Sequence, residues 1–598
     1  MILVLGGTTE GRKVVQLLEQ GNGEYFYSTL GDMQTVECHH GTHISGAMTV
    51  DRMQQFCSDH HIQLIVDAAH PFASNLHATV DAVSRQLTLP VVRYERRYPC
   101  LPHGVVECAD YDDACRKMLD AGVRKLLALT GVQTIGKLRG FWQKRPTVFR
   151  ILDREESLAK VREQGFDESR VVFYHPGNTA MLLEQTGADA IVTKESGESG
   201  GMAEKLEAAL HAGVKIFVVK RPPMPDRFIT VTGNHGLRKM VERYCAGFFN
   251  LRSGFTTGAC ATAAAKAAMQ LLITGDYDHE VAFKLPDGET MEMEVKKAQL
   301  HHDSATAVVV KDAGDDPDVT NGREIHVSVK KNDCDEIRFF GGEGVGRVTL
   351  PGTGLAIGEP AINPVPRAMI SNEIRYIYNG GVDVTVEVPG GEELAARTFN
   401  SRIGIEGGIS IIGTTGIVMP FSHEAFIDAI RKQIEVAMAI GTERIVINSG
   451  ARSERIVKQQ YPNLPSQSFI HYGNAIGETI KAAAEHGVKR LTIGIMVGKA
   501  VKLAEGHLDT HSHNVTLNRD FLCRIAKECG CSDSSIVKIK SLNMARELWN
   551  SIVPCDRDKL MNRIVKLCHG HCSELLPGGE VETLLISDTG EVAYRFQQ

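Results

Sequence analysis

Two segments near the N-terminus have residue types that suit ligand binding, one a phosphate group and the other a substrate. The first, residues 6–12, reads Gly-Gly-Thr-Thr-Glu-Gly-Arg and directly follows an apolar run. Glycines let backbone N–H groups approach a pyrophosphate, and the start of a helix adds partial positive charge. A glycine turn that only links a strand to a helix is the alternative. We predict that the cofactor contacts in this segment are Gly6, Gly7, Thr8, Thr9, Glu10, Gly11 and Arg12.

The second segment, residues 67–73, reads Asp-Ala-Ala-His-Pro-Phe-Ala at the end of a predicted strand. Ligands of open α/β sheets bind at such ends. His70 is therefore predicted as a catalytic acid or as a hydrogen-bond partner of a substrate carboxylate, and the alternative is a histidine that caps the next helix. The predicted substrate contacts are Asp67, His70, Pro71, Phe72 and Arg93.

Three later loops also connect a predicted strand to a predicted helix. Residues 129–131, 175–178 and 192–201 each follow a predicted strand and open a helix, and the last of them joins Lys194 to a loop of glycine and serine. Such a loop suits an anionic group. Thr130, Gly131 and Lys194 are predicted to contact the cofactor.

A further helix start lies at residues 253–260, Ser-Gly-Phe-Thr-Thr-Gly-Ala-Cys. Thr256 and Thr257 can cap the helix, and its N-terminus is suited to an anion. We predict both threonines as substrate contacts, although this segment alone indicates only a capped helix.

The elements that position these residues are predicted from two kinds of hydrophobic pattern. From residue 1 to about 245, β-rich apolar runs alternate with helical patterns, which is typical of parallel βαβ units. The interruption at residues 94–110, which holds Pro99, Pro102 and Gly104, indicates two doubly wound subdomains, about 1–100 and 101–247.

From about residue 280 to 388 the apolar residues alternate, as in residues 292–296 and 325–329, which predicts antiparallel sheet with a helix near 366–376. After residue 408 the βα rhythm returns: strands at 409–412, 444–448 and 491–496, and helices at 425–440 and 475–486. We therefore predict an α+β lobe at about 248–405 and a third, Rossmann-like α/β lobe at about 406–598. The fold class is α/β overall.

Length and charge exclude several classes of protein. At roughly 150 residues per domain, 598 residues predict about four domains. A net charge of −7 without a long single-sign run argues against nucleic acid or anionic lipid as partners. No apolar stretch reaches the about 18 residues that span a bilayer, and the apolar start is too short for a signal peptide. We expect a cytoplasmic protein with small-molecule partners.

The 14 cysteines are read as reduced, packed thiols. The group Cys568, His569, His571 and Cys572 has metal-ligand residue types but no partner pair at zinc-finger spacing, so we predict no metal there.

The segments 6–12, 67–73, 193–197 and 218–222 together resemble the precorrin-6A reductase family of cobalamin biosynthesis. The resemblance covers about the first 245 residues and implies hydride transfer from NADH or NADPH to the corrinoid ring. One departure concerns residues 28–32, Ser-Thr-Leu-Gly-Asp, where the family is expected to carry an arginine. Because an acid suits a free ribose hydroxyl, Asp32 favours NADH.

Residues 253–260, 346–351, 358–364, 409–416, 497–504 and 506–513 resemble the cobalt-precorrin-5B C(1)-methyltransferase family over about residues 249–598. The resemblance implies methyl transfer from S-adenosylmethionine to a ring carbon of a cobalt corrinoid. The predicted S-adenosylmethionine loop is Gly413, Thr414, Thr415 and Gly416, and Gly450 is a weaker candidate.

Lys499 and Lys502 are predicted as substrate contacts of this module. His511, with Asp509, is predicted to take a proton from the alkylated ring. The alternating run His507, Asp509, His511 and His513 resembles a metal site, but it lies in a loop between predicted helices, and contact with the corrinoid is the preferred interpretation.

The leading hypothesis is a fused bifunctional enzyme that methylates cobalt-precorrin-5B at carbon 1 and then reduces cobalt-precorrin-6A to cobalt-precorrin-6B. The first alternative is a dehydrogenase of small metabolites fused to an unrelated α/β domain. The second is a protein that binds nucleotide or tetrapyrrole without turnover. Whether the chain forms a homo-oligomer stays open.

Overall fold

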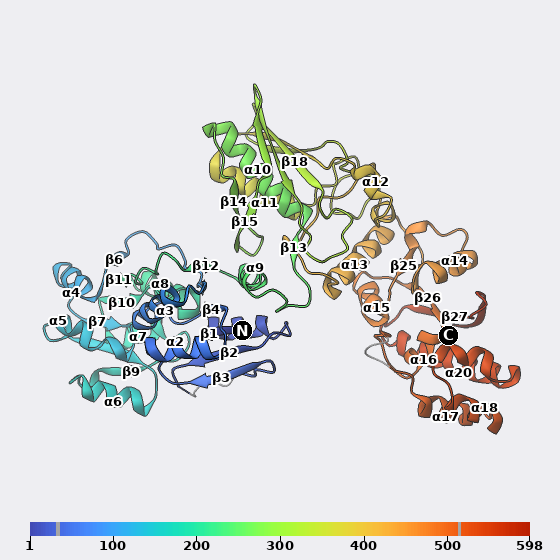
Figure 1. Cartoon of the computed structure of the whole chain (residues 1–598), viewed down its shortest axis with the longest axis horizontal. Coiled ribbons are helices and arrows are strands. Elements are labelled where there is room, and N and C mark those ends of the chain that lie inside the picture. The colour runs from blue at the N-terminus through green and yellow to red at the C-terminus, as the bar shows by residue number, and fades with distance from the viewer. Residues whose placement is uncertain (32–35, 512–515, 598) are drawn as a thin grey trace. The chain divides into compact units, whose positions relative to one another are not determined.

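The computed structural model describes residues 1–31, 36–511 and 516–597, and it divides the chain into two units, Met1–Leu251 and Arg252–Gln598 (Figure 1). Each unit is described by itself. None of the helices in these ranges combines the length and apolar character needed to cross a membrane. Asp32, Ser512 and His513 lie outside the described residues.

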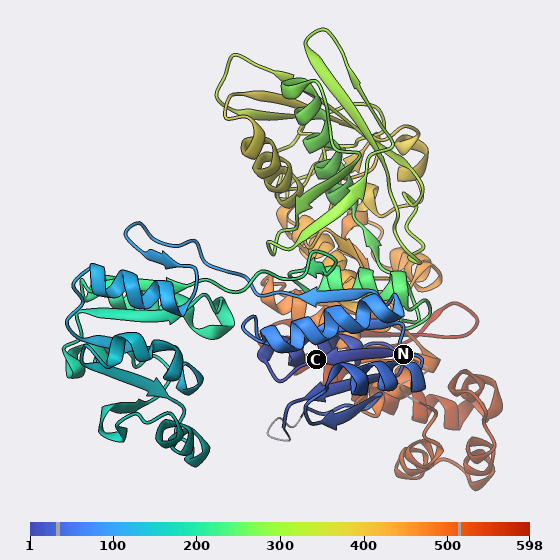
Figure 2. The ribbon, with the colours of Figure 1, turned by 60° about the vertical axis from the view of Figure 1, so that its left-hand side comes forward.

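The first half of unit 1 is a parallel sheet in the order β12-β5-β4-β1-β2-β3 (Figure 2). Every residue of β1, β4 and β5 is buried, as expected for parallel strands that are covered on both faces. The elements are β1 (Ile2–Leu5), α1 (Thr9–Leu18), β2 (Tyr25–Thr29), β3 (Gly41–Ser45), α2 (Val50–Asp59), β4 (Leu64–Asp67), α3 (Ser74–Leu87), β5 (Val91–Tyr94), β12 (Ile229–Val231) and α9 (Asn234–Tyr244).

The second half of unit 1 is another parallel sheet, in the order β6-β11-β10-β7-β8-β9. Its elements are β6 (Val106–Cys108), α4 (Tyr111–Asp120), β7 (Leu126–Ala128), α5 (Arg139–Trp142), β8 (Thr147–Ile151), α6 (Glu155–Glu163), β9 (Val171–Phe173), α7 (Thr179–Thr186), β10 (Ala190–Lys194), α8 (Met202–His211) and β11 (Lys215–Val219). The two doubly wound parallel sheets predicted from the sequence are confirmed.

The predicted extent of the second half, residues 101–247, is wrong at its C-terminal end. Strand β12 pairs with β5 of the first sheet, and Leu237 and Val241 of α9 are buried in the core of the first half. The chain therefore returns to the first half after β11. Order along the sequence could not reveal this, because β12 is short and its pairing partner lies more than 100 residues earlier.

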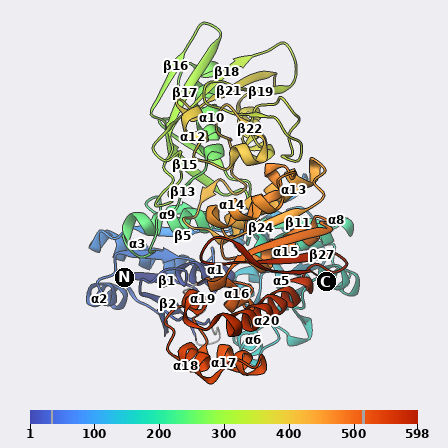
Figure 3. The ribbon, with the colours of Figure 1, turned by 90° about the vertical axis from the view of Figure 1, so that its right-hand side faces the viewer.

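The first lobe of unit 2 has a mainly antiparallel sheet in the order β16-β17-β18-β21-β19, with β19 parallel to β21 (Figure 3). The Ala-rich helix α10 packs against β17 and β18 and beside α11, because its small side chains allow close approach. The elements are β13 (Gly254–Phe255), α10 (Thr257–Thr274), β14 (Glu280–Lys284), β15 (Thr290–Glu294), β16 (Lys297–Leu300), β17 (Ser304–Val310), β18 (Glu324–Lys331), β19 (Ile337–Gly341), β20 (Arg347–Val348), α11 (Pro364–Ile377), β21 (Val382–Glu387), α12 (Gly391–Ala395), β22 (Ile405–Glu406) and β23 (Ile417–Val418).

The strand predicted at residues 409–412 is wrong. Ile409 and Ile411 make only isolated bridges, with Val345 and Ile362, and both side chains are buried in the core around α10. This segment therefore belongs to the α+β lobe and forms no part of the third parallel sheet. The apolar run is explained by burial in an irregular segment, which periodicity alone does not distinguish from a strand.

The second lobe of unit 2 is a sheet in the order β25-β24-β26-β27-β28, in which only β28 is antiparallel. It confirms the predicted return to α/β architecture. The elements are α13 (His423–Ala439), β24 (Ile445–Asn448), α14 (Ala451–Gln460), β25 (Phe469–His471), α15 (Ile476–Glu485), β26 (Arg490–Met496), α16 (Val497–Ala504), α17 (Arg519–Glu528), α18 (Asp533–Lys540), α19 (Leu548–Ser551), α20 (Pro554–Ser573), β27 (Glu580–Ile586) and β28 (Val592–Gln597).

Candidate functional sites

Each parallel sheet has a point where the strand order reverses, and the loops after the two strands that flank it form a crevice for ligands. In the first half of unit 1 these strands are β1 and β4, in the second half β7 and β10, and in the last lobe β24 and β26. The loops after the first two pairs of strands hold the predicted contacts at residues 6–12, 67–73, 130–131 and 194. These residues were predicted to lie at strand ends, and the strand order shows that those ends flank the two switch points.

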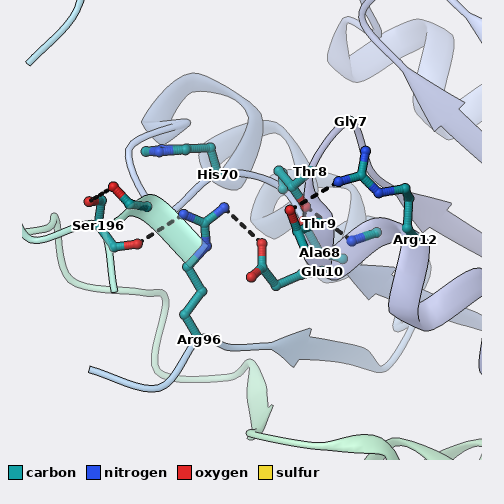
Figure 4. Close-up of polar contacts among 12 residues, drawn as sticks. Gly7, Thr8, Thr9, Glu10, Arg12, Ala68, His70, Arg96 and Ser196 are labelled. Carbon is teal, nitrogen blue, oxygen red and sulfur yellow. Dashed lines mark hydrogen bonds and ion pairs between the residues drawn. The ribbon is translucent and has the colours of Figure 1, made fainter. Parts of the chain in front are cut away.

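The loop after β1 is tied to the loop after β4 by Thr8. Its hydroxyl accepts a hydrogen bond from Gly11 N at 3.0 Å, which caps α1, and donates to Ala68 O at 2.6 Å (Figure 4). A Cβ at Gly6 would lie 2.2 Å from the Tyr27 ring, so Gly6 is required for packing. Gly7, with a φ of +86°, has no atom within 4 Å of such a Cβ. Gly7 is therefore the glycine that leaves room for a ligand.

Two other residues of this segment have different surroundings. Glu10 is 3% exposed, and its carboxylate pairs with Arg96 Nη2 at 2.7 Å (Figure 4). Burial alone would raise the pKa of Glu10, but hydrogen bonding to Ser199 and the charge of Arg96 outweigh it and lower the pKa. Arg12 is exposed and donates to Thr9 Oγ1 at 3.1 Å. Glu10 thus forms a buried ion pair with Arg96, whereas Thr9 is partly exposed and Arg12 is exposed.

Arg96 joins the two halves of unit 1, although no pattern in the sequence marked it as a functional residue. Besides Glu10, its guanidinium donates to Ser196 O, at 2.9 Å, in the loop after β10 (Figure 4). A Cβ at Gly197 would lie 2.9 Å from Arg96 Cβ, which explains the glycine there. The loops at the two switch points therefore lie next to each other.

His70 lies on the same side of the Gly7 loop as Arg96 and Ser196 (Figure 4). Phe72 N donates to His70 Nδ1 at 3.2 Å, so the neutral ring carries its proton on Nε2. Burial, together with the charges of Arg96 and Lys194, lowers the pKa of His70 to about 4. His70 is thus a neutral hydrogen-bond donor at pH 7, which argues against the predicted role as an acid.

Asp67 and Arg93 are buried too deeply to contact a substrate. Both are 0% exposed; Arg93 Nη1 donates to Asp67 at 3.0 Å and to Ala69 O at 2.9 Å, and Glu95 pairs with the same guanidinium. Their charges are compensated internally, so we now assign both residues to the support of the loop after β4. Pro71 in that loop is also buried.

At the switch point of the second half, Thr130 and Gly131 follow β7, and Lys194 ends β10. Thr130 bonds the Thr134 hydroxyl at 2.6 Å, and Gly131 has a φ of +80° with free space where a Cβ would lie. Lys194 Nζ stands 5.5 Å from the centroid of the Phe72 ring, and Phe72 packs against the core of this half. Burial and the charge of Lys137 lower the pKa of Lys194 to about 8.

In unit 2, Thr256 and Thr257 meet residues 410–416. Thr257 Oγ1 accepts from Ile412 N at 3.0 Å and donates to Ser410 O, while Thr256 N donates to Gly416 O at 3.0 Å. A Cβ at Gly413 would lie 2.2 Å from Thr256 Oγ1. The two segments brace each other, and Gly413 and Gly416 serve packing within the α+β lobe; Thr414 and Thr415 are exposed.

The strand-end crevice of the last lobe instead involves Gly450 after β24 and Gly498 after β26. Both have no atom within 4 Å of a Cβ position. Lys499 follows Gly498, and its Nζ donates to Gly473 O after β25. Burial and the charge of Lys502 lower the pKa of Lys499 to about 8. Gly498 was not among the predicted residues, although it lies in the segment 497–504 that carried the resemblance.

Beside this crevice lies a cavity of about 520 Å³ lined by His423, Phe426, Gly473, Asn474, Ala475, Asp509 and His511. Asp509 bridges to Ala475 and accepts from His511 N at 2.9 Å, and Lys502 donates to Thr510 O. The structure therefore brings the predicted Asp509 and His511 close to Lys499. His507 lines a different pocket.

Cys568 and Cys572 lie on buried positions of α20. The Cys568 thiol donates to Ala500 O at 3.2 Å, and burial raises the pKa of both thiols. They are packed, protonated core residues.

The family model "Precorrin-6x reductase CbiJ/CobK" matches residues 1–240. The models "CbiD" and "CbiD, C-terminal domain" match residues 246–420 and 509–596. These matches fall on both sides of the division between the two units.

Relatives with a curated name are similar to the second part of the chain. A cobalt-precorrin-5B C(1)-methyltransferase of Prosthecochloris aestuarii is 43% identical over 346 residues, 56% of this chain and 94% of its own length. One of Geobacillus kaustophilus is 41% identical over 323 residues, 53% of this chain and 87% of its own length.

Two solved structures are also similar. "CobK precorrin-6A reductase" is 22% identical, with a TM-score of 0.36, and covers 41% of this chain and 98% of its own. A "cobalamin biosynthesis protein (cbiD)" of Archaeoglobus fulgidus is 30% identical, with a TM-score of 0.24, and covers 42% of this chain and 78% of its own.

Proposed function

The chain belongs to the cobalt-precorrin-5B C(1)-methyltransferase family and also carries a precorrin-6x reductase region, and on that premise we propose that it catalyses two consecutive steps of corrin-ring synthesis. The two families indicate a bifunctional enzyme of cobalamin biosynthesis. In the proposed sequence, S-adenosylmethionine methylates cobalt-precorrin-5B at carbon 1, and NADH or NADPH then reduces cobalt-precorrin-6A to cobalt-precorrin-6B.

The observation that carries the reductase proposal is the contact between the loops at the two switch points of unit 1, made through Arg96. The open backbone at Gly7 and the N-terminus of α1 would receive the pyrophosphate, with Thr9 and Arg12 at its edge. The cofactor supplies the hydride. Because its ring is neutral with a proton on Nε2, His70 would donate a hydrogen bond to a ring carboxylate and help to orient the corrinoid.

For methyl transfer we revise the cofactor loop from residues 413–416 to the crevice at Gly450 and Gly498, because only that pair flanks a switch point. S-adenosylmethionine supplies the methyl group, and the protein must hold it in line with the nucleophilic ring carbon. Phe426, which is 39% exposed in the adjoining cavity, offers an apolar face to the ring.

When the nucleophilic ring carbon takes the methyl group from the sulfonium, the alkylated ring carries a positive charge, and loss of one proton neutralises it. His511 lies in the cavity wall beside Asp509 and is the proposed acceptor of that proton. Lys499 and Lys502 would keep the neighbouring loops in place through their bonds to Gly473 O and Thr510 O.

The direct test uses the full-length protein with cobalt-precorrin-5B, S-adenosylmethionine and either NADH or NADPH, followed by mass spectrometry of the corrinoid. We expect gain of one methyl group and then of two hydrogens. Without dinucleotide the reaction should stop after methylation, and comparison of initial rates identifies the preferred dinucleotide. An unchanged corrinoid with all reagents present would refute the proposed function.

A further inference from the structure

Three basic side chains lie near the carboxyl ends of strands in the second half of unit 1: Arg150 and Lys205 are buried, and Lys194 is half-buried. Arg150 lies near the end of β8 and is 5% exposed, Lys205 lies in the first turn of α8 and is 8% exposed, and Lys194 ends β10. The pKa of Lys205 is lowered by burial and by the charges of Arg150, Lys194 and Arg96, so these groups face the same region.

The recorded hydrogen bonds of this basic cluster go to neutral atoms. Arg150 Nη1 donates to Asn178 Oδ1 at 3.1 Å and to Thr179 Oγ1 at 2.9 Å, and Lys205 Nζ donates to Gly200 O at 2.6 Å. Lys194 stands over the Phe72 ring. In the part of the chain that the structure describes, none of the three cations forms an ion pair with a carboxylate.

One carboxylate, Glu204, lies beside the cluster: the Thr179 hydroxyl accepts from Arg150 and donates to Glu204, and the negative charge of Glu204 acts on Arg150 and Lys205. Its oxygens accept from Thr179 N at 3.1 Å and from Thr179 Oγ1 at 2.8 Å, so its hydrogen-bonding capacity is directed to the start of α7. Lys137 adds positive charge near Lys194. One carboxylate beside three cations leaves a net positive charge in this mostly buried region, which favours the binding of an anion from outside the chain.

We propose that Arg150, Lys194 and Lys205 form a subsite that binds a carboxylate side chain of the corrinoid while its ring lies beside His70 and Phe72. This inference rests on the proposed function. A carboxylate is favoured over a cofactor phosphate because the open glycine loop at Gly7 and the α1 N-terminus already provide a pyrophosphate site in the other half. The planar guanidinium of Arg150 can bind a carboxylate through two hydrogen bonds.

The kinetic test compares full-length wild type with Arg150→Gln and Lys205→Met in the reduction of cobalt-precorrin-6A. We expect KM for the corrinoid to rise about tenfold or more in each variant, the usual effect of losing one charged partner, while the Kd of the dinucleotide stays within about twofold. Lys144→Met removes an exposed lysine of the same half and serves as the matched control. An unchanged KM, or an equal loss of dinucleotide affinity, would overturn the subsite.

A second measurement needs no turnover and separates this inference from the proposed function. Tricarballylate, a small tricarboxylate, should raise the unfolding temperature of wild type and of Lys144→Met, and should raise that of both cluster variants by less than half as much. Equal shifts in all four proteins would refute the subsite. If inorganic phosphate but not tricarballylate gave this pattern, the site would belong to a phosphate, and the carboxylate assignment would be wrong.

Discussion

His70 illustrates how the surroundings of one side chain decide its chemistry. The sequence places it correctly at a strand end, but burial and nearby cations hold its pKa at about 4, below the usual 6.5. Protonation of His70 therefore favours the unfolded state, and the protein loses stability as the pH falls from about 6.5 towards 4.

From this we predict that His70→Gln makes the protein less sensitive to acid. The difference in unfolding temperature between pH 7 and pH 5 should be smaller in the variant, because the group that takes up a proton on unfolding is gone. His103→Gln, at an exposed position, should behave like wild type. Equal acid sensitivity of all three proteins in scanning calorimetry would contradict the shifted pKa.

Gly498 gives a test of the revised methyl-donor site at the residue scale. A Cβ there meets no atom within 4 Å, so Gly498→Val should fold, yet its side chain would occupy the proposed crevice. We expect binding of S-adenosylmethionine, measured by calorimetry, to weaken at least about a hundredfold, whereas Gly570→Val on the exposed face of α20 leaves it unchanged. Wild-type affinity in Gly498→Val would place the cofactor elsewhere.

At the scale of elements, the start of α10 is braced by residues 410–416. Thr257 is 3% exposed, and its hydroxyl both donates to and accepts from that segment. This brace explains why a segment that resembles a glycine-rich cofactor loop sits in the α+β lobe: its glycines accommodate the helix start.

We predict that Thr257→Val lowers the free energy of unfolding by about 1–3 kcal/mol, because it removes the hydroxyl that accepts from Ile412 N and donates to the buried Ser410 O. Thr414→Val, an exposed threonine of the same segment, should cost less than about 0.5 kcal/mol. If residues 410–416 instead formed a loop that does not brace α10, urea unfolding would show the same decrease in the free energy of unfolding for Thr257→Val and Thr414→Val.

At the scale of the whole molecule, the chain carries the two families on two structural units. In the full-length protein, Gly7→Val should abolish reduction, because the side chain would occupy the pyrophosphate site and the φ of +86° disfavours valine. Methylation should continue at the wild-type rate, and cobalt-precorrin-6A should accumulate in the mass spectrum. Loss of both activities in a folded variant would show that the sites depend on each other.

Part of this organisation was determined by the sequence alone. Local hydrogen bonding and the alternation of apolar residues dictate strands, helices and the glycine loops between them, so the α/β class, the antiparallel lobe and the loops at residues 6–12 and 67–73 could be read directly. The resemblance of linked segments indicated both families.

The tertiary structure alone decided which loops share a crevice and which charges are compensated. Strand order depends on pairings between distant residues. Strand β12, for example, pairs with β5, and residues 409–412 make only isolated bridges outside the third parallel sheet. Burial likewise depends on the packed molecule: Arg93 has a carboxylate partner and Arg150 does not, although both stand in similar apolar strands. No local pattern encodes that difference, because it arises from side chains that the fold brings together from separate parts of the chain.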